Sequence, residues 1–426
     1  MQISQLYEIY QQYASVQTDT RKLKQGDLFF ALKGDNFNGN AFTKQAIDSG
    51  ASFSVIDDAT FVIPGKTILV DDVLNTLQQL AKYHREQFTI PFLAITGSNG
   101  KTTTKELIHA VLSTSYKTYT TEGNLNNHIG IPLTLLKIKN DAEIAVIEMG
   151  ANHLKEIEGY CKYTLPTHGL ITNCGKAHLE GFINEAGVRK AKGELFDHLR
   201  STNGTAFIMS DYDYLLEMSK GIAQIIKYGT TNSAIEGKAA NNETQLTVEI
   251  TKGNFTGKIK TQLVGDFNLP NILAAVAVGN FFKVPAEKIK SSIEKYTPSN
   301  SRSQLIEIGT NKIILDAYNA NPSSMKLAIE NFAKLNADKK ILVLGAMAEL
   351  GNETEREHEL IINLIDMYKW EDVILVGESF KNINHSYKNF ITSSEANEWF
   401  AKQRFENSYL LIKGSRSTSM EKVIEQ

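Results

Sequence analysis

Short apolar segments alternate with helix-forming segments along most of this chain, and this alternation limits what it can fold into. After His84, the segments IPFLAIT, KTYTT, EIAVIEMG and HGLITN each have the composition of a short buried strand, and each is followed by a helical pattern. Beyond Tyr296, the segments KIILDAY, KKILVLGA, DVILVG and SYLLIKG repeat the arrangement. Strands that alternate with helices form parallel sheets through right-handed crossovers. The pattern therefore predicts a doubly wound central unit and a second, Rossmann-like unit.

Length and composition predict three domains. The chain has 426 residues, and about 150 residues per domain would give two or three domains. Residues 1–83 predict a small α/β domain in which DLFFAL, SFSVI and TILV are strands. Residues 84–296 predict the central domain, with an antiparallel extension over residues 232–264 and two closing helices, NILAAVAVGNFF and AEKIKSSIEKY. The linker-like segment TPSNSRSQ lies at the start of a C-terminal domain over residues 297–426.

The charge balance argues against several classes of function. There are 45 basic and 48 acidic side chains, which give a net charge of −3 and no general attraction to nucleic acid. The start, MQISQLYEIY, lacks the basic and apolar regions of a secretion signal, and no apolar run reaches the length of about 18 residues that crosses a membrane. We therefore expect a cytoplasmic protein, and the charge is compatible with a monomer.

The two cysteines, Cys161 and Cys174, lack the spacing of a metal site. Both are expected to be reduced residues in or near the core.

A glycine-rich loop in FLAITGSNGKTTTKE joins an apolar strand to a helix. Such a loop directs backbone N–H groups and the positive end of the helix dipole at an anion, so it predicts a phosphate site. The lysine of such a loop reaches the β- and γ-phosphates, and the following hydroxyl ligates magnesium. The general pattern GxxxxGK[ST] is not met, because Ile95 stands where it needs glycine. A turn that only joins strand to helix is the alternative. The residues expected to hold the nucleotide here are Gly97, Ser98, Asn99, Gly100, Lys101, Thr102 and Thr103.

Three further residues are candidates for a metal site. Glu148 ends the apolar strand in EIAVIEMG, at the sheet edge where doubly wound folds bind ligands; a helix cap or surface carboxylate is the alternative. His178 lies just past HGLITN, so it and Glu148 would converge from neighbouring strand ends. Magnesium prefers oxygen ligands, so a histidine with no metal role is equally compatible. In GVRKAKGELF, Arg189, Lys192 and Phe196 share one side of a helix, and the spacing alone favours a solvated basic face.

Together these motifs resemble the ATP-dependent Mur ligases of peptidoglycan synthesis, and within that family the members that add D-alanyl-D-alanine. The resemblance covers nearly the whole chain. It rests on TDTRKLKQGDLFFALKG in the first domain, on AITGSNGKTTTKE, TEGNLNNHIGIPLTLL, IEMGANHLKEI, AHLEGF, GVRKAKGELF and FNLPNILAA in the second, and on DAYNANPSSMKLAI, LGAMAELG and KGSRSTSMEKVI in the third. The ATP loop of this family has the short form TGxxGK[ST], which accounts for Ile95.

The resemblance implies roles for individual residues. At the ATP phosphates it implies Lys101 and Thr102, with Arg302 facing the γ-phosphate. At the rest of the nucleotide it implies Asn268 and Asn271 beside the base and Asp316 at the ribose. Two magnesium ions are expected, with Glu148 and His178 as ligands and Lys192 as a carbamylated lysine that adds a further ligand. Among these, Lys101, Lys192, His178 and Arg302 would be catalytic. Phe267 and Ala346 replace the usual histidine and aspartate of the family. For the other substrates it implies Thr20, Arg21, Asn126, Asn127, Asn319, Asn321, Ser415 and Arg416.

The implied reaction joins D-alanyl-D-alanine to UDP-N-acetylmuramoyl-tripeptide through an acyl phosphate, with ATP as the phosphoryl donor. Because the implied residues lie on three domains, we expect open and closed arrangements. A related ligase that adds a single amino acid, including the folylpolyglutamate type, is one alternative. A non-catalytic nucleotide-binding protein on the same fold is another.

Overall fold

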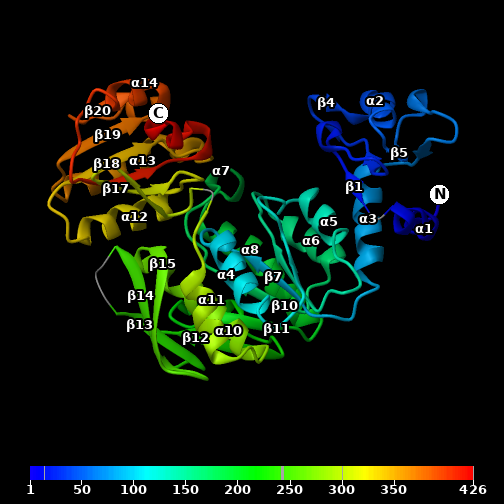
Figure 1. Cartoon of the computed structure of the whole chain (residues 1–426), viewed down its shortest axis with the longest axis horizontal. Coiled ribbons are helices and arrows are strands. Elements are labelled where there is room, and N and C mark those ends of the chain that lie inside the picture. Colours follow the sequence, from blue (N-terminus) through cyan, green and yellow to red (C-terminus); the bar gives the residue numbers. More distant parts are fainter. Residues whose placement is uncertain (14, 241–243, 300, 426) are drawn as a thin grey trace.

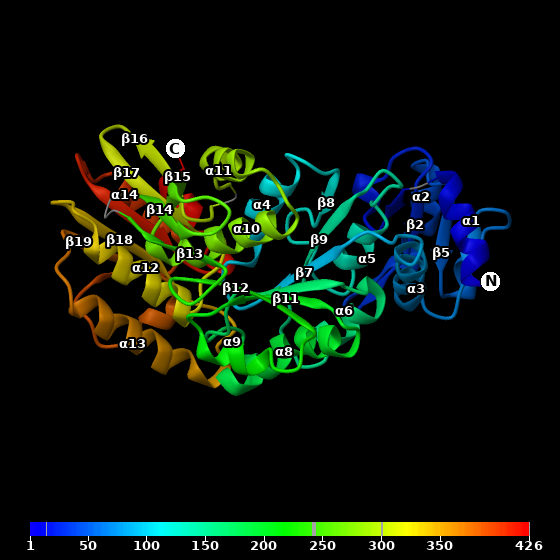
Figure 2. The ribbon, with the colours of Figure 1, turned by 90° about the horizontal axis from the view of Figure 1, so that it is seen from below.

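The structure, a computed structural model, describes residues 1–13, 15–240, 244–299 and 301–425. Within these residues the strands form sheets of four, nine and six strands and one two-stranded ladder. The three larger sheets define three α/β bodies, which we call the first, central and third bodies. The first and third bodies lie at opposite ends of the central one (Figures 1 and 2). The predicted fold class, α/β with three such units, is confirmed.

The first body is a small parallel sheet with helices around it. Its strands follow the order β1-β2-β5-β6 and comprise Val16–Gln17, Leu28–Phe30, Phe53–Ile56 and Thr67–Leu69. A short ladder joins β3 (Lys33–Gly34) to β4 (Phe37–Asn38). The helices are α1 (Ile3–Tyr13), α2 (Thr43–Asp48) and α3 (Val73–Arg85). The last of these leads the chain into the central body (Figure 1).

The central body contains the nine-stranded sheet, in the order β15-β14-β13-β12-β11-β10-β7-β9-β8. Its strands are β7 (Phe92–Thr96), β8 (Thr118–Thr120), β9 (Ile144–Glu148), β10 (His168–Ile171), β11 (Thr205–Met209), β12 (Gln224–Gly229), β13 (Ile235–Ala239), β14 (Gln245–Lys252) and β15 (Gly257–Val264). Strands β7 to β13 are parallel, and β14 and β15 are antiparallel, as predicted for the extension. The helices are α4 (Lys101–Leu112), α5 (Gly130–Leu135), α6 (Glu156–Thr164), α7 (Leu179–Phe182), α8 (Glu185–Ser201), α9 (Asp213–Met218), α10 (Leu269–Phe281) and α11 (Ala286–Lys295).

The strand order corrects one expectation. Glu148 and His178 do not come from neighbouring strands, because β7 lies between β9 and β10. After β7 the chain builds β9 and β8 on one side and then crosses to build β10 and β11 on the other. The loop that follows β7 therefore sits at a topological switch point, where doubly wound folds bind their ligands.

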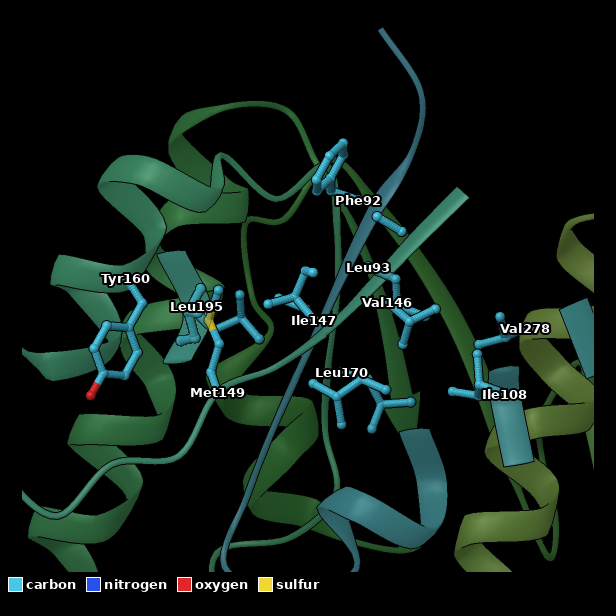
Figure 3. Packing of buried hydrophobic residues seen from close by; sticks show 14 of the residues in the cluster. Phe92, Leu93, Ile108, Val146, Ile147, Met149, Tyr160, Leu170, Leu195 and Val278 are labelled. Atoms are coloured by element: carbon cyan, nitrogen blue, oxygen red, sulfur yellow. The ribbon is translucent and has the colours of Figure 1, made fainter. Parts of the chain in front are cut away.

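Two layers of helices cover the central sheet. Tyr160 of α6 and Leu195 of α8 lie on one side of the strands, and Ile108 of α4 and Val278 of α10 lie on the other (Figure 3). All residues of β7 and β9 are buried between these layers, which is why both segments are continuous apolar runs. This packing fixes the loop after β7 and Glu148, the last residue of β9. The predicted core positions of Cys161 and Cys174 are confirmed, since both are buried free thiols.

The third body is a six-stranded sheet with the order β16-β17-β21-β18-β19-β20. Its strands are Gln304–Ile308, Asn311–Asp316, Lys340–Gly345, Asp372–Val376, Lys388–Phe390 and Tyr409–Lys413, numbered β16 to β21 in chain order, and its helices are α12 (Pro322–Lys334), α13 (Thr354–Asp366) and α14 (Ser393–Phe400). The β16 strand was not predicted, and it runs antiparallel to β17. It begins at the end of the predicted linker, of which Asn300 lies outside the described residues.

The three bodies differ in how their cores connect. One apolar cluster runs from the first body through the central sheet. The third body instead has one cluster on each face of its sheet, so that Ile314 of β17 belongs to one and its neighbours Ile313 and Leu315 to the other. The cluster of Ile314 also takes in Leu179 and Val264 of the central body. The domain ranges 1–83, 84–296 and 297–426 remain our working division. Among the described residues, no helix combines the length and the apolarity needed to cross a membrane.

Candidate functional site

The loop between β7 and α4 has a backbone that only glycine fits at two positions. Gly97 has φ 142° and Gly100 has φ 78°, both in the region that favours glycine. A Cβ atom on Gly97 would lie 2.0 Å from Thr172 Oγ1, and one on Gly100 would lie 2.7 Å from Asn271 Oδ1. The loop therefore passes close to both neighbours and opens the helix at Lys101. Its N–H groups and the helix N-terminus are arranged as the predicted anion site requires.

The Lys101 side chain folds back over this loop. Its Nζ donates hydrogen bonds to the carbonyl oxygens of Gly97, at 2.6 Å, and Ser98, at 3.3 Å. Burial lowers the pKa of the Lys101 ammonium, and the charge of Glu148 acts in the opposite direction. The ammonium is held at the mouth of the loop, so a phosphate bound there would meet a positive charge without a large side-chain movement.

Glu148 offers a free carboxylate oxygen beside the loop. The residue is 1% exposed. Its Oε1 accepts hydrogen bonds from Thr102 Oγ1, at 3.1 Å, and Asn126 Nδ2, at 2.8 Å. Its Oε2 has no hydrogen-bond partner among the described residues and lies 3.9 Å from Lys105 Nζ. A buried carboxylate oxygen without a partner, next to a hydroxyl, fits a hard cation such as Mg²⁺.

The protein groups around Glu148 suit a cation that keeps other ligands. No three His, Cys, Asp or Glu side chains converge as a metal-binding group within the part of the chain that the structure describes. Magnesium is commonly coordinated by one or two carboxylates together with water and substrate phosphates. A single buried carboxylate beside the Thr102 hydroxyl is consistent with this coordination.

His178 faces the third body. It precedes α7 in a left-handed conformation, with φ 51°. Its Nδ1 lies 2.6 Å from Oε2 of Glu349, in the loop after β18, and this contact with His178 lowers the pKa of Glu349. His178 lines the same cavity as Glu148. The structure thus brings both candidate metal ligands to one cavity, from either side of β7.

Lys192 lies inside the protein. It is 1% exposed, its Nζ donates to the carbonyl oxygen of Ala151 at 3.0 Å, and the Phe182 ring is 5.0 Å away. Burial lowers the pKa of Lys192 to about 7, with a further contribution from the charge of Lys101. The interpretation of a solvated basic face is therefore wrong for Lys192, although Arg189 on the same helix is exposed. Spacing could not reveal this, because α8 packs against α6 and turns only part of that side to solvent.

Asn268 and Asn271 are both buried at the start of α10. Asn271 Nδ2 donates to Asn268 Oδ1 at 2.9 Å, and Thr104 Oγ1 of α4 donates to Asn271 Oδ1 at 3.0 Å. Asn268 Nδ2 donates to the Val264 carbonyl oxygen at 2.8 Å. The pair therefore holds α10 against α4, the helix that follows the loop between β7 and α4, which we call the phosphate loop (residues 97–103). Both asparagines also line the cavity.

The third body adds a cation and an acid to the cavity. The Arg302 guanidinium lies 3.6 Å from the centre of the Tyr318 ring, and its Nε is buried without a hydrogen-bond partner among the described residues. Asp316 accepts from Lys413 Nζ and from the Ser303 N–H. Asn321 caps α12 and also donates from Nδ2 to Asn99 Oδ1 at 2.7 Å. That last contact joins the third body directly to the phosphate loop.

One cavity of about 660 Å³ brings most of the predicted residues together. Those that line it are Ser98, Asn99, Gly100, Lys101, Thr102, Thr103, Asn126, Asn127, Glu148, His178, Asn268, Asn271, Arg302, Asp316, Asn319 and Asn321, and Phe267 is also in its wall. The side chain of Asn127 also accepts from the N–H groups of Ile129 and Gly130, at the start of α5.

Four predicted substrate residues lie outside this cavity. Thr20 and Arg21 are in the first body, where the exposed Arg21 guanidinium pairs with Asp19. Ser415 is buried and donates to the Ala346 carbonyl oxygen. Arg416 lies beside Tyr318 and lines a separate cavity of about 330 Å³ that also includes Arg302.

Three charged residues that lie near the site without lining the main cavity were not predicted from the sequence. Lys105 is 2% exposed, donates from Nζ to the Thr121 carbonyl oxygen at 2.7 Å, and faces Glu148. Its position four residues after Lys101 on α4 was an available signal. Lys176 and Glu357 form an ion pair between the central and third bodies. A pairing across so many residues leaves no local pattern in the sequence.

Three parts of the chain match descriptions of one family. Residues 12–85 match "Mur ligase family, catalytic domain", residues 95–279 match "Mur ligase middle domain", and residues 301–416 match "Mur ligase, glutamate ligase domain". The UDP-N-acetylmuramoyl-tripeptide–D-alanyl-D-alanine ligase of Bacillus subtilis is 34% identical, over 96% of this chain and 92% of the relative. The chain belongs to the Mur ligase family. The resemblance found in its motifs is thus confirmed.

Solved structures of this family are also similar. A crystal structure of MurF from Acinetobacter baumannii aligns with a TM-score of 0.87 and 29% identity, over 96% of this chain and 92% of that one. The MurF ligase of Thermotoga maritima, solved in complex with ADP, aligns with a TM-score of 0.86 and 25% identity, over 96% of both chains. Both similarities extend across all three bodies.

Proposed function

We propose that this protein is an ATP-dependent ligase that joins D-alanyl-D-alanine to UDP-N-acetylmuramoyl-tripeptide. The observation that carries the proposal is the 34% identity with the Bacillus subtilis ligase over 96% of the chain. The cavity supports it, because the cavity combines a phosphate-binding loop with an arginine from another body. The product would be the pentapeptide precursor used in peptidoglycan synthesis, and the substrates would be soluble small molecules met by a monomer in the cytoplasm.

ATP is proposed to bind with its phosphates on residues 97–103, its ribose at Asp316 and its base toward Asn268 and Asn271. The glycine conformations and the start of α4 support the phosphate position. The complex of the related Thermotoga maritima ligase with ADP supports nucleotide use by the family. Phe267, in place of the usual histidine, presents an apolar ring to the same cavity.

Magnesium is proposed at Glu148 and Thr102, where the unpartnered Oε2 of Glu148 supports it. When bound, the ion would offset negative charge on the phosphates during transfer. His178 is a second candidate ligand. Lys192 is a candidate for carbamylation, since a carbamate forms on a neutral amine and a pKa of about 7 keeps much of this amine neutral near pH 7.

The proposed chemistry begins with activation of a carboxylate, because a carboxylate and an amine do not condense in water. The terminal carboxylate of the tripeptide attacks the γ-phosphate of ATP, ADP leaves, and an acyl phosphate forms. The amine of D-alanyl-D-alanine then attacks the acyl carbon, and inorganic phosphate leaves from the tetrahedral intermediate. Two anions meet in the first step, so Lys101 and Arg302 would offset their repulsion from two sides of the cavity.

The muropeptide is proposed to reach this cavity from the first body. Thr20 and Arg21 would contact its uridine diphosphate end, and Asn126 and Asn127 would contact the part nearer the phosphate loop. Asn319, Asn321, Ser415 and Arg416 would act on the dipeptide side, in the third body. Tyr160, His128 and Glu156 support a continuous path, because they line both the main cavity and a second cavity of about 520 Å³ beside α3.

Oxygen-isotope transfer tests the proposal. The tripeptide carboxylate is labelled with ¹⁸O, and the protein is incubated with ATP, Mg²⁺ and D-alanyl-D-alanine. One label should appear in the released inorganic phosphate, and mass spectrometry should detect ADP and the pentapeptide. Turnover with a free amino acid in place of the dipeptide would indicate the single-amino-acid alternative. Nucleotide binding without turnover would indicate the non-catalytic one.

The carbamate is tested by chemical rescue. Lys192→Ala should lose most of its activity, and a short-chain carboxylate in the buffer should restore part of it. Full activity of the unrescued variant would exclude a carbamate at this position.

A further inference from the structure

The segment between β10 and α7, residues 172–178, lies between the phosphate loop and the third body. We call it the coupling segment. On its central side, Thr172 Oγ1 donates to the Asn99 carbonyl oxygen at 2.6 Å, and Ser98 Oγ donates to the Gly175 carbonyl oxygen at 2.9 Å. The Asn173 side chain bonds both the N–H and the carbonyl oxygen of Asn99. These bonds fix the segment to the two residues at the tip of the phosphate loop.

On its other side, the coupling segment contacts two helices of the third body. The Lys176 N–H donates to Ser323 Oγ of α12 at 2.8 Å, and Lys176 Nζ donates to Glu357 Oε1 of α13 at 2.6 Å. A Cβ atom on Gly175 would lie 2.7 Å from Ser323 Oγ, so the Ser323 side chain lies directly against the Gly175 backbone. The segment thus bonds the phosphate loop and the third body at the same time.

The Lys176–Glu357 pair differs from the surface ion pairs of the chain. The Glu357 side chain is 4% exposed, whereas the Lys176 side chain is 37% exposed. A buried carboxylate that loses its cation is left without compensation, and this makes separation of the pair unfavourable. Any movement that lifts the third body away from the coupling segment has to separate Lys176 from Glu357.

We propose that the coupling segment links nucleotide binding at the phosphate loop to docking of the third body, with Lys176 as its positioning residue. A phosphate that orders Ser98 and Asn99 also orders residues 172–178, and these hold Lys176 where Glu357 can meet it. Docking in turn brings Arg302 to the cavity. The inference rests on the proposed function, because Arg302 matters only if a phosphoryl group is transferred there.

The test is a double-mutant cycle on the full-length protein, with Lys176→Met, Glu357→Gln and the double variant. In the ligation assay, each single variant should lose about tenfold in kcat, with a smaller change in the KM for ATP, because the loop contacts to ATP remain. The double variant should lose no more than the worse single one, since both remove the same interaction. Lys220→Met is the matched control, because its pair with Glu217 has the same 2.6 Å distance but lies exposed on the surface. It should keep the wild-type kcat.

Small-angle X-ray scattering with ADP and Mg²⁺ separates this inference from the proposed function. Lys176→Met should have a larger radius of gyration than the wild type and the Lys220→Met control. Losses that multiply in the double variant, or an unchanged radius of gyration, would overturn the coupling role. If the scattering result holds but no variant and no wild-type protein ligates the dipeptide, the proposed function fails and the coupling stands.

Discussion

The central body has two interfaces, one with the first body and one with the third, which we call the first seam and the third seam. Different kinds of contact hold these two seams together. At the seam with the first body, apolar side chains form one core that is continuous with the central sheet, and Tyr10 OH donates to the Leu136 carbonyl oxygen. At the seam with the third body, only Leu179 and Val264 among the buried apolar residues that the structure describes in the central body join a cluster of the third body, and beside them lie an ion pair and an amide hydrogen bond, from Asn321 to Asn99. Apolar burial stabilises a fold strongly, whereas water can replace a neutral hydrogen-bond partner at a small net cost; parting the buried Glu357 carboxylate from Lys176 costs more than that. From this contrast we expect the first seam to hold the fold, and the third seam to be the one that opens and closes if the bodies move during turnover.

His84 shows how the first seam combines apolar and polar contacts. It lies on α3 and is 5% exposed. Its Nε2 is 2.8 Å from the Ile138 carbonyl oxygen, and its Nδ1 is 3.0 Å from Tyr7 OH. Because a carbonyl oxygen only accepts, Nε2 carries the proton. Burial lowers the pKa of His84, which favours the neutral ring, and in that form Nδ1 accepts from the tyrosine. One neutral imidazole therefore joins α1, α3 and the central body.

The largest expected effect is at the third seam. Arg302→Met should lower kcat by about 10²- to 10³-fold, the usual loss when one group that stabilises transition-state charge is removed. The free energy of unfolding should fall by no more than about 1 kcal/mol, because the variant loses the cation–π contact with Tyr318 but Nε has no hydrogen bond to lose among the described residues. Steady-state kinetics and urea unfolding measure the two quantities. Arg302→Lys should retain part of the rate, and equal losses of rate and stability would contradict a seam that serves turnover alone.

The matching change at the first seam is His84→Leu. It leaves Tyr7 OH and the Ile138 carbonyl oxygen buried without this partner, so the free energy of unfolding should fall by about 1–3 kcal/mol. The kcat at a temperature well below unfolding should stay within about twofold, because His84 is not among the residues that line the main cavity. Urea unfolding and the ligation assay test both parts. A large drop in kcat with unchanged stability would reverse the comparison between the seams.

The pH dependence of stability sharpens this test. Burial lowers the pKa of His84, so below the ordinary histidine pKa the unfolded chain binds a proton that the folded chain resists. The wild type should therefore lose stability as pH falls from about 7 toward 5, by at most about 1.4 kcal/mol per pH unit from this one group. His84→Leu should show a shallower slope. Urea unfolding at several pH values measures it, and equal slopes would mean that His84 is not neutral in the fold.

The sequence predicted most strands of the three larger sheets and the glycine-rich turn between β7 and α4, but it did not predict β1, β11, β12, β16 or β20. Physical reasons explain several of the parts that it did not predict. Runs such as EIAVIE report that both faces of a strand are buried, but they do not report which strands are neighbours. Glu148 and His178 were therefore expected on adjacent strands, although β7 separates them. The β16 strand was missed because its residues, QLIEI, are only partly buried and follow a segment that favours turns.

Charged residues limited the prediction of the site in the same way. The helix pattern placed Lys192 on a basic face, yet that lysine is buried, because tertiary packing decides which part of a mixed face meets solvent. Glu349 and Glu357 lie on the third body and meet His178 and Lys176 of the central body only when the two bodies touch. No local spacing encodes such a contact. The family resemblance supplied roles for His178 and Lys192 that the spacing alone left open.

A smaller effect is expected from Tyr10→Phe at the first seam. The change removes the hydroxyl that bonds the Leu136 carbonyl oxygen and keeps the buried ring. The free energy of unfolding should fall by about 1 kcal/mol, the typical net value of one hydrogen bond. The kcat should not change. Tyr13→Phe, at an exposed ring on the same helix, is the control for unfolding measurements and should have no effect.

The smallest expected effect comes from Asn321→Ser, which separates two roles of one side chain at the third seam. Asn321 caps α12 through Oδ1 and donates from Nδ2 to Asn99 Oδ1. Serine also caps helices well, so the free energy of unfolding should change by less than about 0.5 kcal/mol. Serine is too short to keep the bond to Asn99, so kcat should fall by a factor of about 2–5, as expected for one neutral hydrogen bond. Asn321→Ala is the comparison variant, because it removes the cap as well. If Asn321→Ser destabilises the protein as much as Asn321→Ala but leaves kcat unchanged, the third seam serves folding, as the first does.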